Sequence, residues 1–190
     1  MKKDIILAGV GGQGILTIAT VIGQAAISSK MNLKQAETHG MSQRGGDVQS
    51  HLRISTEKIH SDLIPMGGAD LIISVEPMEA LRYLPYLHED GWLITNSTTF
   101  ENIPNYPEAE EIYKEIKAVK NHVIIDADKI AKDLGSPRSM NIVVLGASMK
   151  TLGLTLQQIE ESIKTIFGRM GDEVVDANIK ALRAGFEAAK

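Results

Sequence analysis

The sequence at residues 5–14 reads Ile-Ile-Leu-Ala-Gly-Val-Gly-Gly-Gln-Gly. Its first four residues form a continuous apolar run, which is typical of a buried parallel strand. Apolar residues then recur at helical spacing through residues 14–29, which predicts an amphipathic helix. A strand that passes through a glycine-rich turn into a helix is a common opening unit of α/β folds. We therefore expect this stretch to set the fold.

Strand and helix patterns alternate along the rest of the chain. Strands are expected at 32–37, 48–54, 70–75, 91–95 and 122–126, and helices at 77–84, 108–119, 126–135, 141–152, from 155 and at 172–189. Residues 55–58 look like a tight turn into a short returning strand near Ile59, so 48–60 is expected to be an antiparallel insertion. Together these patterns predict one domain over 1–190, a three-layer Rossmann-like α/β fold with a mostly parallel sheet.

Polar residues at helix starts indicate where several helices begin. Asp126 or Asp128 is expected to cap the helix that ends at Gly135, and Thr155 opens a capping box with Gln158. Asp172 is expected to cap the final helix.

Composition excludes several classes of protein. With 190 residues, a net charge of −4, 4% aromatic residues and no basic stripe, the chain is a poor match for a nucleic-acid-binding module. It has no cysteine, which excludes a disulfide framework and thiolate-held zinc or iron–sulfur clusters on this chain. No apolar run approaches a membrane span, and the start is unlike a signal peptide, so a cytoplasmic location is expected.

The first glycine-rich loop satisfies the pattern G-x-G-x-x-G at Gly9, Gly11 and Gly14, with Gly12 and Gln13 between them. Free N–H groups at a helix start favour an anion such as a phosphate or a carboxylate. The alternative is a turn that only packs the strand against the helix. The pattern by itself leaves both interpretations open.

Two nucleotide-binding classes can be compared with this loop. A Walker lysine is absent, because Gln13-Gly14-Ile15 stands in its place, which argues against ATP hydrolysis. For NAD, a dinucleotide fold needs an acidic residue at the end of the second strand, and Glu37 lies near that position. An NAD-binding oxidoreductase or sensor domain therefore stays open.

The second glycine-rich stretch, residues 36–46, reads Ala-Glu-Thr-His-Gly-Met-Ser-Gln-Arg-Gly-Gly. Arg44 suits a carboxylate or phosphate because its guanidinium donates paired hydrogen bonds. Gly45 and Gly46 would let the backbone approach the same ligand. An ordinary loop with a structural His39 and a surface Arg44 is the alternative, although the density of polar groups weakens it.

These two motifs resemble the gamma-type domain of the 2-oxoacid:ferredoxin oxidoreductases. The sequence of the second motif is most similar to that of the small (beta) subunit of the indolepyruvate type. Residues 70–77, 96–97 and 141–147 carry the resemblance further, so it spans nearly the whole chain.

The resemblance implies a subunit of a thiamine diphosphate-dependent enzyme. Such an enzyme oxidatively decarboxylates a 2-oxo acid with coenzyme A and reduces ferredoxin. Thiamine diphosphate and [4Fe-4S] clusters would lie on a large partner subunit, and this chain would be inactive alone. Aryl pyruvates would be the substrates of the indolepyruvate type, although the sequence does not identify the oxo acid, the stoichiometry or any self-association of the isolated chain.

The resemblance also suggests which residues face the substrate, coenzyme A or the partner. They are His39, Gln43, Arg44, Gly45, Gly46, Gly9, Gly11, Gly12, Gln13, Gly14 and Asn141. Arg44 is the leading candidate for holding an anion, whereas acid–base work by His39 has little support because the cofactor supplies the hard chemistry. Glu37 is expected to orient His39 or Arg44, and Asn141 is assigned equally to a helix cap or a ligand contact. A non-catalytic docking scaffold is the remaining alternative.

Overall fold

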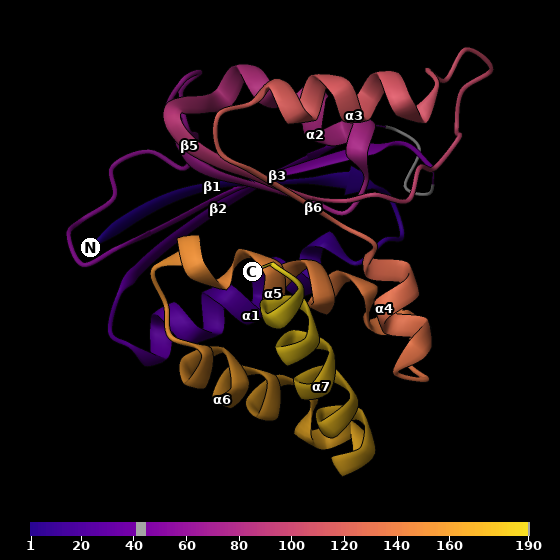
Figure 1. Cartoon of the computed structure of the whole chain (residues 1–190). Coiled ribbons are helices and arrows are strands. Elements are labelled where there is room, and N and C mark those ends of the chain that lie inside the picture. The colour runs from indigo at the N-terminus through magenta and orange to yellow at the C-terminus, as the bar shows by residue number, and fades with distance from the viewer. Residues whose placement is uncertain (41–44, 190) are drawn as a thin grey trace.

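The computed structural model describes residues 1–40 and 45–189, in which helices cover both faces of one sheet (Figure 1). The strands are β1 (Lys2–Val10), β2 (Asn32–His39), β3 (Asp47–Ser55), β4 (Ala69–Ser74), β5 (Leu87–Asn96) and β6 (His122–Ile125). The helices are α1 (Ile15–Ser28), α2 (Pro77–Arg82), α3 (Ala109–Ala118), α4 (Ala127–Asp133), α5 (Met140–Leu152), α6 (Leu156–Phe167) and α7 (Asp172–Ala188), with 3₁₀ turns at Leu84–Tyr86, Pro137–Ser139 and Gly168–Met170. The expected alternation of strands and helices is confirmed.

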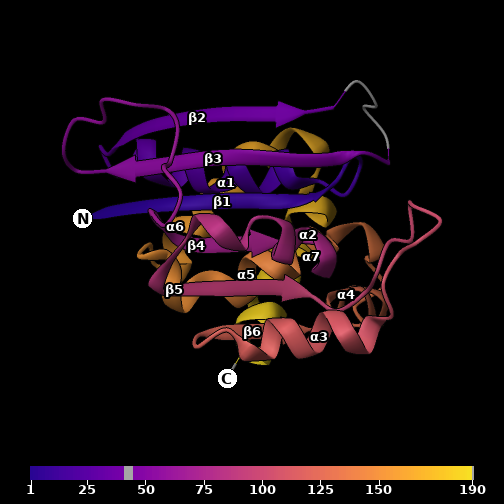
Figure 2. The ribbon, with the colours of Figure 1, turned by 90° about the horizontal axis from the view of Figure 1, so that it is seen from above.

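The strands lie in the order β2-β3-β1-β4-β5-β6 (Figure 2). β1, β4, β5 and β6 pair in parallel, whereas β3 pairs antiparallel with both β1 and β2. The mostly parallel sheet with an antiparallel insertion is thus confirmed, and β3 over residues 47–55 is the inserted strand. β2 and β3 form a hairpin. The residues that connect them, 40–46, belong to the second glycine-rich stretch.

The returning strand expected near Ile59 is wrong. Residues 56–68 form an irregular loop. The Arg53 guanidinium donates to the carbonyls of Ser61 and Leu63 at 3.1 and 3.0 Å, so side-chain contacts rather than a strand ladder hold this loop against the sheet.

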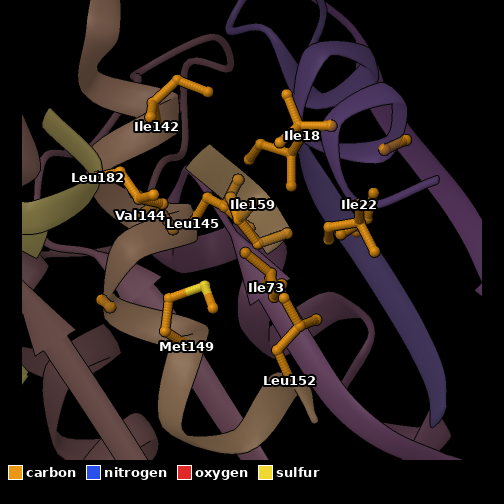
Figure 3. Packing of buried hydrophobic residues seen from close by; sticks show 14 of the residues in the cluster. Ile18, Ile22, Ile73, Ile142, Val144, Leu145, Met149, Leu152, Ile159 and Leu182 are labelled. Carbon is orange, nitrogen blue, oxygen red and sulfur yellow. The ribbon is translucent and has the colours of Figure 1, made fainter. Parts of the chain in front are cut away.

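The core is divided between the two faces of the sheet. α1, α4, α5, α6 and α7 cover one face, and α2 and α3 cover the other (Figure 1). Figure 3 shows the larger cluster, in which residues from α1, β4, α5 and α6 meet: Ile18, Ile22, Ile73, Leu145 and Ile159. These side chains are fully buried or nearly so, and such burial is the main favourable term in folding.

Two of the three expected helix caps are present. The Asp126 side chain accepts a backbone N–H in the first turn of α4, and Thr155 with Gln158 forms the capping box of α6. The Asp172 cap is wrong, because α7 already begins at Asp172. Gly171, with φ 100°, occupies the capping position instead and offers no side chain.

α5 and α7 cross in backbone contact. A Cβ added at Gly146 would lie 2.1 Å from the Leu182 carbonyl oxygen, and one added at Gly185 would lie 1.9 Å from that of Val143. Side chains larger than hydrogen are therefore excluded at both positions, and α7 can press α5 against the sheet.

Candidate functional site

The two glycine-rich loops meet at the carboxyl end of β1. In the antiparallel register of β1 and β3, Val10 is opposite Asp47, so the residues just before β3 must lie beside those just after β1. The Gly11 N–H donates to the Gly46 carbonyl at 2.8 Å, and the Gly45 N–H donates to the Gly11 carbonyl at 3.3 Å. The β2–β3 hairpin therefore brings the two motifs into direct contact.

Two glycines of the first loop are required by packing. A Cβ on Gly9 would lie 2.4 Å from a methyl carbon of Val75. Gly14 has φ 83°, and a Cβ there would lie 2.5 Å from the Asn141 amide nitrogen. Both positions fit the roles that such a loop assigns to its first and last glycines, a tight turn and close helix packing.

The middle of the loop is open toward solvent. The Gln13 side chain accepts the N–H of Val10 at 2.8 Å and so closes the turn from within. Gly12 has φ 102° and no atom within 4 Å of its would-be Cβ. Gln13 thus shapes the loop, whereas Gly12 leaves space in front of it.

Asn141 fastens α5 to the first loop. Its buried amide donates to the Gly14 carbonyl at 3.0 Å, while its oxygen accepts the N–H of Ile142 at 3.0 Å. The N-cap of α5 is Ser139, so Asn141 is not the cap. The expected cap role is therefore wrong, and the expected ligand contact stays a prediction. The structure shows that Asn141 links the starts of α1 and α5.

A cavity of about 460 Å³ lies between the first loop, the first turn of α1 and the end of β2. Its lining residues are Val10, Gly11, Gly12, Gly14, Ile15, Leu16, Glu37, His39 and Val48. Glu37 and His39 belong to it because they pair with Ser50 and Val48 on the face of the sheet that α1 covers. β2 extends through His39, two residues further than expected.

The backbone N–H groups at one end of this cavity suit an anion, whereas the Glu37 carboxylate in the same lining does not. The N-cap of α1 is Gly14, which offers no side-chain cap, so the first-turn N–H groups of α1 and the positive end of its dipole face the loop. The exposed His39 places its Nδ1 3.0 Å from the Gly40 carbonyl oxygen. Within the described residues no hydrogen bond joins Glu37 to His39, so the expected orienting contact between them is not seen.

Gln43 and Arg44 lie outside the described residues, which omit 41–44. Their proposed contacts with an anion stay predictions. Gly45 and Gly46, which follow them directly, are placed by the hydrogen bonds to Gly11.

The sequence did not reveal a third segment of the site, residues 97–107 between β5 and α3. The Asn102 side chain donates to the Gly45 carbonyl at 2.9 Å. Glu76, which is fully buried at the start of α2, accepts the N–H of Phe100 at 3.2 Å and the hydroxyl of Tyr106. A carboxylate placed directly after a buried strand was the available signal for Glu76.

Tyrosines reinforce these contacts. Burial, together with the hydrogen bond to Glu76, raises the pKa of Tyr106 above its usual value, so its hydroxyl stays a donor. Likewise the Tyr83 hydroxyl donates to Asp47 at 2.8 Å, and burial followed by that bond raises the pKa of Tyr83. Asp47, the first residue of β3, is thereby tied to the end of α2.

The topology fits a dinucleotide poorly. In that fold the second strand lies beside the first, and its terminal acidic residue reaches the ribose. Here β3 separates β2 from β1, so the strand that carries Glu37 lies two strand spacings, roughly 10 Å, from β1. The described residues also contain no group of three or more metal-ligating side chains, and none of their helices is long and apolar enough to cross a membrane.

Comparison with known proteins supports the expected family. The family model for pyruvate ferredoxin/flavodoxin oxidoreductase matches residues 4–188. Indolepyruvate oxidoreductase subunit IorB of Archaeoglobus fulgidus is 38% identical, over 100% of this chain and 96% of its own length. The pyruvate/ketoisovalerate oxidoreductases common subunit gamma of Pyrococcus abyssi is 30% identical, over 97% and 95%.

A solved structure agrees in fold. The crystal structure of pyruvate oxidoreductase subunit PORC from Thermotoga maritima superposes with a TM-score of 0.75 at 24% identity, over 98% of this chain and 96% of that one. The resemblance inferred from the two glycine motifs is thus confirmed across nearly the whole length. The chain belongs to the pyruvate ferredoxin/flavodoxin oxidoreductase family.

Proposed function

We propose that this chain is the small subunit of a heteromeric 2-oxoacid:ferredoxin oxidoreductase that acts on indolepyruvate or a related aryl pyruvate. Full-length similarity to the family carries the proposal. The indolepyruvate relative is more similar, at 38%, than the pyruvate/ketoisovalerate relative at 30%, which favours an aryl substrate. We place the complex in the cytoplasm.

The proposed reaction converts the 2-oxo acid and coenzyme A into an acyl-coenzyme A and carbon dioxide. The electron pair released by this oxidation passes to ferredoxin. Thiamine diphosphate on the large subunit would supply the carbanion chemistry, as cofactors do for hard bond cleavages. Because this chain has no cysteine, the [4Fe-4S] clusters would also be held by the partner.

The role of this chain is then to bind and orient rather than to transform. The cavity between the first loop and β2 offers two kinds of donor. They are the uncapped N–H groups at the start of α1 and the His39 side chain at the end of β2. Arg44 stands directly before the two glycines that contact Gly11, and its planar guanidinium suits a carboxylate or a coenzyme A phosphate. We assign anion holding to Arg44 and a supporting donor role to His39.

Reconstitution tests this assignment. The chain would be produced alone and together with a large subunit that carries thiamine-binding and ferredoxin-type cysteine motifs. We expect coenzyme A-dependent reduction of ferredoxin with indolepyruvate only from the assembled pair, with pyruvate and 2-oxoglutarate as poorer substrates. Equal activity of the large subunit without this chain would overturn the proposal, and tight NADH binding by the isolated chain would support the dinucleotide alternative.

Arg44→Ala is the sharpest variant for the anion-holding role. Loss of a charged, paired hydrogen bond should lower kcat/KM of the assembled enzyme at least roughly tenfold while assembly is retained. Arg183→Ala is the matched control, because the Arg183 side chain is 61% exposed and pairs with Glu160 of α6, away from both glycine-rich loops. Weakened assembly with unchanged specific activity of the complex would instead favour a docking scaffold.

A further inference from the structure

Gly45, in the second glycine-rich stretch, is held by hydrogen bonds from two sides. On one side, the N–H of Gly45 donates to the Gly11 carbonyl at 3.3 Å. On the other, the carbonyl of the same residue accepts the Asn102 amide at 2.9 Å, across 57 positions of sequence. Gly45 has φ 78° and no atom within 4 Å of its would-be Cβ, so no side-chain packing fixes this backbone. Hydrogen bonds at its N–H and at its carbonyl therefore determine where Gly45 lies.

We propose that Asn102 is a positioning residue, which fixes the backbone of Gly45 and thereby holds the contact between the two glycine-rich loops beside the cavity that Gly11 and Gly12 line. The proposal rests on the ligand-binding function proposed above for this cavity. The contact itself is independent of that function, because it joins two described backbone segments of this chain.

Glu76 braces the segment that carries Asn102. Its carboxylate is fully buried and accepts three donors: the N–H of Phe100 at 3.2 Å, the hydroxyl of Tyr106, and the N–H of Glu79 at 2.8 Å. Phe100 and Tyr106 lie on either side of Asn102 in sequence. The segment is thus anchored before and after Asn102 to the first turn of α2.

This arrangement distinguishes Asn102 from its neighbours. Donors bonded to a buried carboxylate make a stiff support, and residues that position a site need such support. The other amide of the segment, Asn105, is exposed and has no hydrogen bond among the described contacts. A loop meant only to connect β5 with α3 would need neither the buried carboxylate nor the bond to Gly45.

The first test uses the full isolated chain. Asn102→Ala is compared with the matched control Asn105→Ala, which removes the same side chain from the same segment. Amide exchange of Gly11 and Gly45, followed by NMR, should accelerate roughly tenfold in Asn102→Ala alone, because a lost hydrogen bond favours opening by about 1.4 kcal/mol. The melting temperatures of both variants should match the wild type. Equal exchange in the two variants would overturn the proposal whatever the activity.

The second test uses the assembled complex. Asn102→Ala should raise the KM for the oxo acid or for coenzyme A roughly tenfold, with kcat changed much less, because a misplaced loop weakens binding more than chemistry. Accelerated exchange with unchanged KM and kcat would overturn the positioning role. An inactive wild-type complex would refute the proposed function instead, and the exchange measurement would then still decide whether Asn102 orders the loop.

Discussion

Gly146 and Gly185 lie where α5 and α7 cross, whereas Gly12 and Gly45 lie where the two glycine-rich loops meet. At the crossing an added Cβ would fall 1.9–2.1 Å from a carbonyl oxygen of the other helix, and the neighbouring side chains are buried. At the loops the φ angles are +102° and +78°, and an added Cβ would meet nothing within 4 Å.

The same residue type therefore serves two purposes. The crossing uses glycine to let two backbones touch, so that the helical layer closes on the sheet. The loops use it to turn the backbone through a left-handed region and to leave space in front of the cavity. It follows that substitutions in the first region should change stability alone, and those in the second should change ligand binding as well.

The largest expected effect is at the helix crossing. Gly185→Ala would force the Val143 carbonyl and the whole of α7 to move, and we expect the free energy of unfolding to fall by about 3 kcal/mol. Urea denaturation followed by circular dichroism measures it. Gly168→Ala is the matched control: Gly168 is helical at φ −55° with open space around it, so its substitution should leave stability nearly unchanged. Equal midpoints for both variants would show that the helices do not touch as described.

The next prediction distinguishes two possible effects of an added methyl group: strain in the backbone, and loss of free space in the cavity. Gly12→Ala and Gly67→Ala each place a methyl group on a residue with positive φ, at a cost of roughly 1–2 kcal/mol. Both sites are open, but only Gly12 lines the cavity. We therefore expect similar losses of stability from the two, and a severalfold higher KM in the assembled enzyme only from Gly12→Ala. A KM change of the same size from Gly67→Ala would mean that strain, not occupied space, explains the effect.

The elements whose signals lie close together in the sequence could be predicted. An apolar run, a glycine turn and helical spacing sufficed for β1, the first loop and α1, since all three signals lie within residues 5–28. The Asp126 cap and the Thr155 capping box were also found, because a cap bonds only within its own first turn. The Asp172 cap failed because Gly171 offers the backbone a left-handed start that needs no side chain.

The contacts between distant segments could not be predicted from local patterns. Asn141 and Gly14 are 127 positions apart, and Asn102 and Gly45 are 57 apart. No periodicity marks such pairs, because their distance is set by the strand order of the sheet. The strand expected near Ile59 failed because the Arg53 side chain binds carbonyls of that loop, a contact that no strand pattern marks.

The smallest expected effect is on the pH dependence of stability, through His51. It tests whether the stability of the sheet can be changed without changing ligand binding. It lies on the face of the sheet opposite α1, 3% exposed, and its Nδ1 accepts the N–H of Ile64 at 2.9 Å. Burial, and then the charge of Arg53, lower its pKa below the usual 6.5. The unfolded chain therefore takes up this proton at a higher pH than the folded chain.

The His51 contribution to stability should accordingly be complete above about pH 6.5 and decline as the pH falls below it, until the folded imidazole also titrates. In His51→Asn the amide oxygen can still accept the N–H of Ile64, but it cannot titrate. Urea denaturation at several values between about pH 5 and 8 should give a difference between wild type and variant that changes only on the acid side. A constant difference would assign the acid sensitivity of the fold to its carboxylates. Because the His51 side chain lies on the face of the sheet opposite the cavity, KM in the assembled enzyme should stay at the wild-type value near neutral pH, in contrast to Gly12→Ala.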